Sequence, residues 1–317
     1  MSDRESDREL QKTIRALIAK EGLPSAYEAT VTNTIMPLLA HILSLREQTG
    51  RPVIAGIHGA QGTGKSTLTL FLRELLQVHW QCPTASLSLD DLYLTRAERL
   101  VLSRTVHPLL KTRGVPGTHD LALGHRVLDQ LLAAGSGDVT PIPAFDKALD
   151  DRVPESRWPV FEGPVQVILL EGWCLGARPQ SEDDLARPVN RLEAEEDAGG
   201  QWRGYVNDCL KNSYHEFFGR LDTLVMLRAP SMDCVLEWRR LQEHKLAQRH
   251  KNASKECAGD GGAQSLRIMS DTEVQRFIMH YQRVTEHCLR TLPNRADVLI
   301  PVGADHFMET PVWNDRI

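Results

Sequence analysis

The 317-residue sequence lacks the features of a membrane, secreted or metal-cluster protein. No apolar run approaches the roughly 20 residues that a membrane-spanning helix needs. The segment from Met1 to Glu9 is charged throughout and cannot form the apolar part of a signal peptide. The six cysteines are scattered, with no C-x-x-C pair and no metal-type spacing. We therefore expect a soluble, cytoplasmic protein whose cysteines are reduced.

An excess of positive charge is also missing. The formal net charge is -5, so the summed field favours neither nucleic acid nor an anionic membrane as a partner. With 41% hydrophobic and 25% charged residues, the composition is that of an ordinary globular protein. Its length suits one large α/β domain or two modest ones.

The chain begins with two amphipathic helical patterns, which we interpret as an N-terminal helical extension over residues 1–50. One face of the second pattern is formed by Val31, Ile35, Leu38, Leu39 and Ile42. Pro37 is expected to kink or interrupt this helix. We expect the two helices to cover an edge of the sheet that follows.

From residue 51 to 317, short apolar runs alternate with helical patterns. This order predicts a doubly wound α/β domain with about five parallel strands and helices on both faces. The predicted strands are 53–57, 85–89, 165–170, 223–227 and 298–302. Segments near 180–201 and 249–265 are acidic or rich in Lys, Gly and Ser, and we predict that they are irregular insertions.

A phosphate-binding signature follows the first predicted strand. Residues 59–66 read Gly-Ala-Gln-Gly-Thr-Gly-Lys-Ser and match G-x-x-x-x-G-K-[ST]. Glycines let successive backbone N–H groups face the phosphates, and the helix that follows adds its partial positive charge. A glycine-rich turn is the alternative, but the flanking strand and helix favour a P-loop. The predicted nucleotide-binding residues are Gly59, Ala60, Gln61, Gly62, Thr63, Gly64, Lys65, Ser66 and Thr67.

The same motif predicts ATP and Mg²⁺ as cofactors. Lys65 is expected to neutralise the β- and γ-phosphate oxygens, and the Ser66 hydroxyl to ligate the metal. The chain contains no Asn-Lys-x-Asp guanine-reading motif and no Leu-Ser-Gly-Gly-Gln transporter signature. A phosphate acceptor site must therefore be sought at the other strand ends.

Acidic residues follow two predicted strands. Asp90 and Asp91 follow the strand 85–89, and Glu171 follows the strand 165–170. Ligands of open α/β sheets bind at the carboxyl ends of the strands. Phosphoryl transfer needs one carboxylate to orient or deprotonate the attacking hydroxyl and another to hold Mg²⁺. We assign Asp90 to the first role and Glu171, with Ser66, to the second. The alternative for Asp90 or Asp91 is a helix cap.

Several short segments in a fixed order carry a family resemblance. They are 86–93, 107–114, 116–121, 142–147, 170–176, 237–243 and 269–271. The first resembles the segment of the uridine kinase, phosphoribulokinase and pantothenate kinase group in which the first Asp, here Asp90, is the catalytic base. Together with the P-loop, the segments resemble D-glycerate 3-kinase, the plant-type glycerate kinase, and its bacterial and fungal relatives. The resemblance covers most of residues 50–306 and implies a P-loop kinase fold with a helical lid.

The resemblance also implies roles for polar residues outside the P-loop. Arg239 and Arg240 lie where the resembled kinases carry lid arginines that stabilise charge on the transferring phosphoryl group, so we group both with Lys65 and Asp90 as catalytic. The predicted acceptor-binding residues are Asp91, Tyr93, Arg113, His119, Asp120 and Lys147. A helix cap at Asp120, a solvated Lys147 and a solvated helix face at the two arginines are the alternatives.

We interpret the chain as a kinase that transfers the γ-phosphate of ATP to a hydroxyl of a small metabolite. D-glycerate, giving 3-phosphoglycerate, is the acceptor that the resemblance implies. The first alternative keeps the chemistry and changes the acceptor to another hydroxy acid, a nucleoside or a sugar. The second is a nucleotide-dependent binding module that phosphorylates no metabolite.

Overall fold

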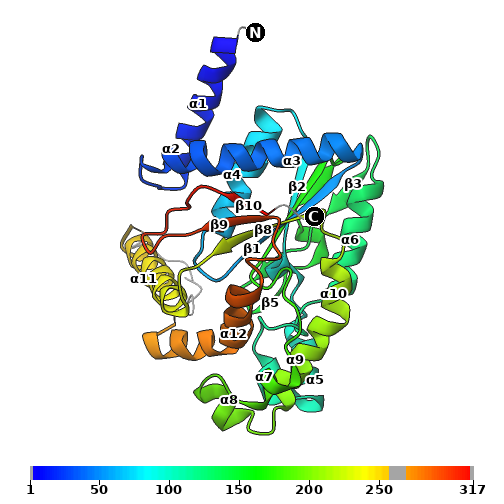
Figure 1. Ribbon diagram of the computed structural model, residues 1–317, viewed down its shortest axis with the longest axis vertical. Helices are drawn as coiled ribbons and strands as arrows, with labels where there is room; N and C mark the ends of the chain where they lie inside the picture. The colour runs from blue at the N-terminus through cyan, green and yellow to red at the C-terminus, as the bar shows by residue number, and fades with distance from the viewer. Residues whose placement is uncertain (1–2, 257–268, 315–317) are drawn as a thin grey trace.

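The computed structural model describes residues 3–256 and 269–314, and its centre is a six-stranded sheet (Figure 1). The strand order is β10-β9-β8-β1-β7-β2. The strands are β1 (Val53–Gly59), β2 (Thr84–Ser88), β7 (Val167–Gly172), β8 (Thr223–Arg228), β9 (Val298–Pro301) and β10 (Val312–Trp313). The first five are parallel, which confirms the predicted α/β P-loop fold. The sequence pattern missed β10, a short strand that runs antiparallel to β9.

Alternating side chains of the strands enter two hydrophobic cores, one on each face of the sheet. In β1, Ala55 and Ile57 belong to the core that contains apolar residues of α3 (Met36–Thr49) and α4 (Lys65–Val78). Ile54 belongs to the opposite core, which contains residues of α6 (Leu121–Ala133), α9 (Gln201–Lys211) and α10 (Ser213–Phe218). Burial of both faces explains why the parallel strands read as continuous apolar runs.

The N-terminal extension forms α1 (Asp3–Lys20), α2 (Tyr27–Thr30), a π-helical turn (Val31–Ile35) and α3. Figure 1 shows α3 lying across the sheet and α1 projecting beyond it. The predicted apolar face is fully buried. α3 contacts the interior strand β1, and its His41 ring lies 5.0 Å from that of Trp313 in the edge strand β10, so the extension reaches the expected edge but also covers the interior of the sheet. The π-helical turn directly precedes Pro37 in the first turn of α3. Because proline has no N–H to donate, the regular α pattern is interrupted there without ending the helix.

The two predicted insertions are more regular than the sequence pattern suggested. The first contains α7 (Glu182–Ala186) and α8 (Arg191–Glu196). The fully buried Glu193 of α8 pairs with Arg283 of α12 (Asp271–Thr291) at 2.6 Å, which fixes this segment to the domain. In the second, residues 249–256 continue α11 (Met232–Glu256), and 257–265 lie outside the described residues.

The chain between β2 and β7 contains several short elements, the first of which contacts both strands. They include the 3-10 turn Leu89–Leu92, α5 (Arg96–Thr105) and the 3-10 turn Pro108–Lys111. Two small hairpins follow, one from β3 (Val139–Pro141) and β6 (Val160–Glu162), the other from β4 (Phe145–Asp146) and β5 (Asp151–Arg152). No helix in the described part of the chain is long and apolar enough to cross a membrane.

Candidate active site

The predicted phosphate-binding segment forms a loop between β1 and α4. Gly62 and Gly64 adopt φ of 83° and 90°, the left-handed region that favours glycine. A side chain at Gly62 would also collide with Trp238, whose Cβ lies 2.6 Å from an ideal Cβ at that position. Lys65 Nζ donates to the carbonyl of Ala60 at 3.3 Å, so its ammonium lies over the loop. The strand, loop and helix therefore follow in the order that phosphate binding requires.

Three oxygen-bearing side chains meet beside this loop at the ends of β2 and β7. The sheet register pairs Ser88 with Glu171. The Ser66 and Ser88 hydroxyls both donate to Oε1 of Glu171, at 3.1 and 3.0 Å. Mg²⁺ is commonly held by one or two protein oxygens together with substrate phosphates and water. The donor set of Ser66 and Glu171 therefore fits this ion, and the chain between residues 3 and 314, as far as the structure describes it, has no larger His, Cys, Asp or Glu cluster that could hold a metal.

Asp90 lies in the turn after β2 and holds two side chains of the predicted site. Tyr93 donates its hydroxyl to Oδ1 at 2.8 Å, and Lys147 donates Nζ to Oδ2 at 2.7 Å. Burial alone raises the pKa of Asp90, but the charges of Lys147 and Lys65 and these hydrogen bonds outweigh it and hold the pKa well below its usual range. Asp90 is therefore ionised at neutral pH.

Asp91, the next residue, has the opposite electrostatic environment. Its Oδ1 accepts the backbone N–H of Phe145 at 3.1 Å, which attaches the β4–β5 hairpin to the turn after β2. Burial raises the pKa of Asp91 to about 6, assisted by the charges of Asp90 and Glu171 and opposed by the Phe145 hydrogen bond and Lys147. Two adjacent carboxylates thus differ in their partners and in the direction of their pKa shifts.

The other predicted acceptor-binding residues lie on the same side of the site as Asp90 and Asp91, but their side chains differ in accessibility. Arg113 forms an ion pair with Asp150 and lies 5.5 Å from the centroid of the Phe145 ring. His119 is buried, stacks on Tyr93 at 4.6 Å and binds the Tyr214 hydroxyl through Nδ1 at 2.5 Å.

Asp120 accepts the N–H of Leu123 and caps α6, as the alternative interpretation of this residue held. Its other carboxylate oxygen accepts from Arg152 at 3.2 Å.

Burial lowers the pKa of His119 to about 3, so this imidazole is neutral at physiological pH.

The predicted lid arginines lie on α11, directly after Trp238, the residue that packs against Gly62. Arg239 pairs with the buried carboxylate of Glu243 and lies 5.5 Å from the centroid of the Phe277 ring in α12. The Nε atom of Arg240 is buried without a hydrogen-bond partner. Across the described residues, no hydrogen bond joins either arginine to Lys65 or Asp90. The structure therefore brings Lys147 to Asp90 but holds Arg239 on Glu243.

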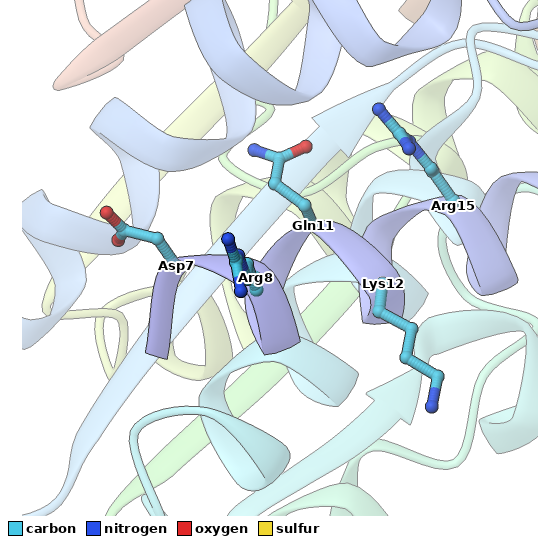
Figure 2. Close-up of a pocket in the computed structure, with 5 residues that line it drawn as sticks. All are labelled: Asp7, Arg8, Gln11, Lys12 and Arg15. Carbon is cyan, nitrogen blue, oxygen red and sulfur yellow. The ribbon is translucent and has the colours of Figure 1, made fainter. Parts of the chain in front are cut away.

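A hollow at the N-terminal helix is separate from this site. Figure 2 shows the five side chains that line it, and all of them come from α1. They are Asp7, Arg8, Gln11, Lys12 and Arg15. Arg15 already pairs with Glu28 at 3.1 Å. None of the predicted nucleotide or acceptor residues lines this hollow, so we do not assign it to the active site.

Two functional candidates were missed by sequence reasoning. Ser88 joins Glu171 to the backbone of Asp90, whose N–H it accepts at 3.2 Å. The sequence feature that could have identified Ser88 is its position near the end of a predicted strand, two residues before Asp90. Arg99 is the second, and its role emerges only from contacts with three separate segments. A single arginine within an amphipathic helix carries no such signal.

Comparison with known proteins places the chain in a family. An uncharacterised kinase of Schizosaccharomyces pombe, mug58, is 34% identical over 255 residues, covering 78% of this chain and 84% of that protein. The chloroplastic D-glycerate 3-kinase of Arabidopsis thaliana is 32% identical over 249 residues, or 76% of this chain, and the match spans about half (48%) of the plant protein.

A solved structure, D-glycerate 3-kinase from Cryptococcus neoformans, superimposes with a TM-score of 0.68 at 25% identity and covers 88% of this chain and 98% of its own. No family model matches the sequence. The chain therefore belongs to the family of P-loop kinases that includes D-glycerate 3-kinase and its fungal relatives.

Proposed function

We propose that the protein transfers the γ-phosphate of ATP to a hydroxyl of a small anionic metabolite, with D-glycerate as the first candidate and 3-phosphoglycerate as its product. The observation that carries this proposal is the ionised Asp90, bonded to Lys147 and Tyr93 beside the P-loop. Relatives named D-glycerate 3-kinase support the choice of acceptor.

The nucleotide half of the proposed site is the loop 59–67 and the first turn of α4. Backbone N–H groups of the loop and the helix N-terminus receive the phosphates. Lys65 then leaves the carbonyl of Ala60 for the β- and γ-phosphate oxygens. Ser66 and Glu171 would hold Mg²⁺, which would neutralise phosphate charge when bound.

The acceptor half is formed by Asp90, Lys147 and Arg113. Asp90 accepts the hydrogen of the attacking hydroxyl and fixes the oxygen in line with the γ-phosphate. Its low pKa makes it a weak base, which suits a loose transition state in which orientation contributes more than early proton removal. Lys147 has 59% of its side chain exposed and is free to turn from Asp90 toward a substrate.

The charges of this half favour a hydroxy acid over a neutral acceptor. Lys147 and Arg113 are the cations of the acceptor half, each paired in this structure with a protein carboxylate, Asp90 or Asp150, that the carboxylate of an acceptor would replace. The guanidinium of Arg113 is suited to bidentate binding of such a carboxylate. A nucleoside or a neutral sugar offers no charge to either group. We expect the lid to contribute Arg239 only after it exchanges the Glu243 carboxylate for the transferring phosphoryl group.

An acceptor panel tests this proposal. Purified protein is supplied with ATP and Mg²⁺, and ADP release is measured with D-glycerate, L-glycerate, a nucleoside, a neutral sugar or no addition. We expect ADP release that depends on a hydroxy acid, with a phosphorylated product detected by ³¹P NMR. ATP hydrolysis that no acceptor alters would instead support a nucleotide-dependent binding module.

A further inference from the structure

We propose that Arg99 is a positioning residue that assembles the acceptor half of the site, an inference that rests on the proposed function. Arg99 lies in α5 and has an exposed fraction of 0%, which makes it the largest fully buried side chain described. A guanidinium carries its charge at every physiological pH and is costly to bury unless each donor is satisfied. Its partners therefore indicate what the burial achieves.

Those partners are three separate stretches of backbone. Nε donates to the carbonyl of Leu94 at 3.2 Å, one terminal nitrogen donates to that of Lys111 at 2.8 Å, and the other donates to that of Asp150 at 2.7 Å. Each stretch carries a predicted acceptor residue within three positions of the bonded carbonyl. Tyr93 precedes Leu94, Arg113 follows Lys111, and Lys147 precedes Asp150. One planar side chain thus fixes three loops that are distant in sequence.

The counter-charge of Arg99 connects it to the substrate side. Its second terminal nitrogen also lies 3.0 Å from Oδ1 of Asp150, and the same carboxylate oxygen binds Arg113. Asp150 adopts φ of 55°, a left-handed conformation that aspartate tolerates better than most residues other than glycine. The bonds from Arg99 to both the carbonyl and the carboxylate hold Asp150 in that conformation. The direction of Arg113 therefore depends on Arg99 through Asp150.

The ring of Phe145 completes the arrangement. The guanidinium carbons of Arg99 and Arg113 lie 5.9 and 5.5 Å from its centroid. The backbone N–H of Phe145 is bonded to Asp91, so the hairpin that carries Lys147 is attached on one side to the turn of Asp90 and on the other to Arg99. Arg99 itself has no place in the chemistry. It determines where Arg113 and Lys147 meet an acceptor.

Arg99→Lys tests this role because lysine keeps the charge but cannot reach three carbonyls. We expect the KM for the acceptor to rise about tenfold or more while the KM for ATP changes less than about twofold. In an Arg113→Ala background, Arg99→Lys should raise the acceptor KM by a smaller factor than in the wild type, because part of its effect passes through Arg113 and the rest through the hairpin that carries Lys147. Should Arg99→Lys fold poorly, Asp150→Asn replaces it and is expected to shift the acceptor KM in the same direction.

The matched control is Arg283→Lys, which removes another buried arginine that binds backbone carbonyls, those of Asp184 and Arg187. It should lower stability without moving the acceptor KM. Amide hydrogen exchange gives a readout that needs no acceptor: Arg99→Lys should speed exchange in 111–114 and 145–151, and Arg283→Lys in 180–196. Unchanged exchange in those loops, or equal effects of Arg99→Lys with and without Arg113, would overturn the inference. A wild-type protein that phosphorylates no acceptor would overturn the proposed function alone.

Discussion

The two halves of the proposed site are built in different ways. Apart from Glu171, the nucleotide half is one continuous segment, residues 59–67, whose groups are mainly backbone atoms placed by a strand, two left-handed glycines and a helix. The acceptor half is gathered from the turn after β2, the loop before α6 and the β4–β5 hairpin. The geometry of the nucleotide half is set mainly by the local sequence of its motif. The geometry of the acceptor half depends on tertiary contacts such as those of Arg99 and Asp150.

The largest effect should come from the nucleotide half. Lys65→Ala removes the ammonium that neutralises the β- and γ-phosphates, so we expect transfer to fall by about 10³-fold or more. Circular dichroism should show an unchanged fold, because the Lys65 side chain makes a single long hydrogen bond, to Ala60, among the residues that the structure describes. Turnover close to that of the wild type would show that the loop does not bind the transferred phosphate.

Removal of the charge of Asp90 should have the second-largest effect. Asp90→Asn keeps an acceptor oxygen for Tyr93 but loses the ion pair with Lys147. We expect kcat to fall by roughly 10²–10⁴-fold in single-turnover measurements at saturating ATP and acceptor. Asp91→Asn is the neighbouring control and should cost far less. If Asp91→Asn is the crippled variant, the assignment of the two carboxylates is reversed.

Glu171 should affect the requirement for metal more than the chemistry itself. Glu171→Gln preserves an acceptor for the Ser66 and Ser88 hydroxyls but removes the negative charge. We expect the Mg²⁺ concentration for half-maximal activity to rise about tenfold. A chelator should abolish activity, and added Mg²⁺ should restore it. A Mg²⁺ titration identical to that of the wild type would assign Glu171 to support of the sheet edge.

The smallest effect concerns stability and separates the two neighbouring carboxylates. The pKa of Asp91 is raised to about 6 in the folded protein. Its ionisation therefore destabilises the fold fully above about pH 6, and this destabilisation fades as pH falls toward the unfolded pKa of about 4. Asp91→Asn should therefore raise the free energy of unfolding by about 1 kcal/mol at pH 7.5 and by less at pH 5.

The pKa of Asp90 is lowered, so its charge stabilises the fold at neutral pH, and this stability is lost as pH falls below about 4. Asp90→Asn should lower the free energy of unfolding at pH 7.5. Urea unfolding of both variants at the two pH values measures the difference. Shifts of the same sign would contradict the opposite environments of the two carboxylates.

The same contrast explains what the sequence could predict. Five parallel strands, the P-loop and the strand-end carboxylates follow from local patterns, and the structure has all of them. The positions of Asp90 and Lys147 were identified, but not their bond, because 57 residues separate them. The segment 180–201 appeared irregular since its order comes from Glu193 and Arg283, which are 90 residues apart. Nothing in the sequence indicated the role of Arg99, because this side chain binds three backbone carbonyls, and no pattern of side chains identifies such partners.

The central claim is that the P-loop half binds the nucleotide while the half around Asp90 binds the acceptor. Nucleotide affinity tests this claim most directly. Isothermal titration with Mg²⁺ and a non-hydrolysable ATP analogue gives Kd for the wild type, Lys65→Ala and Asp90→Asn. We expect Lys65→Ala to weaken binding by about 10²-fold and Asp90→Asn to change it by less than about twofold, since Asp90 serves only the acceptor. An Asp90→Asn protein that loses nucleotide affinity as Lys65→Ala does would contradict the account.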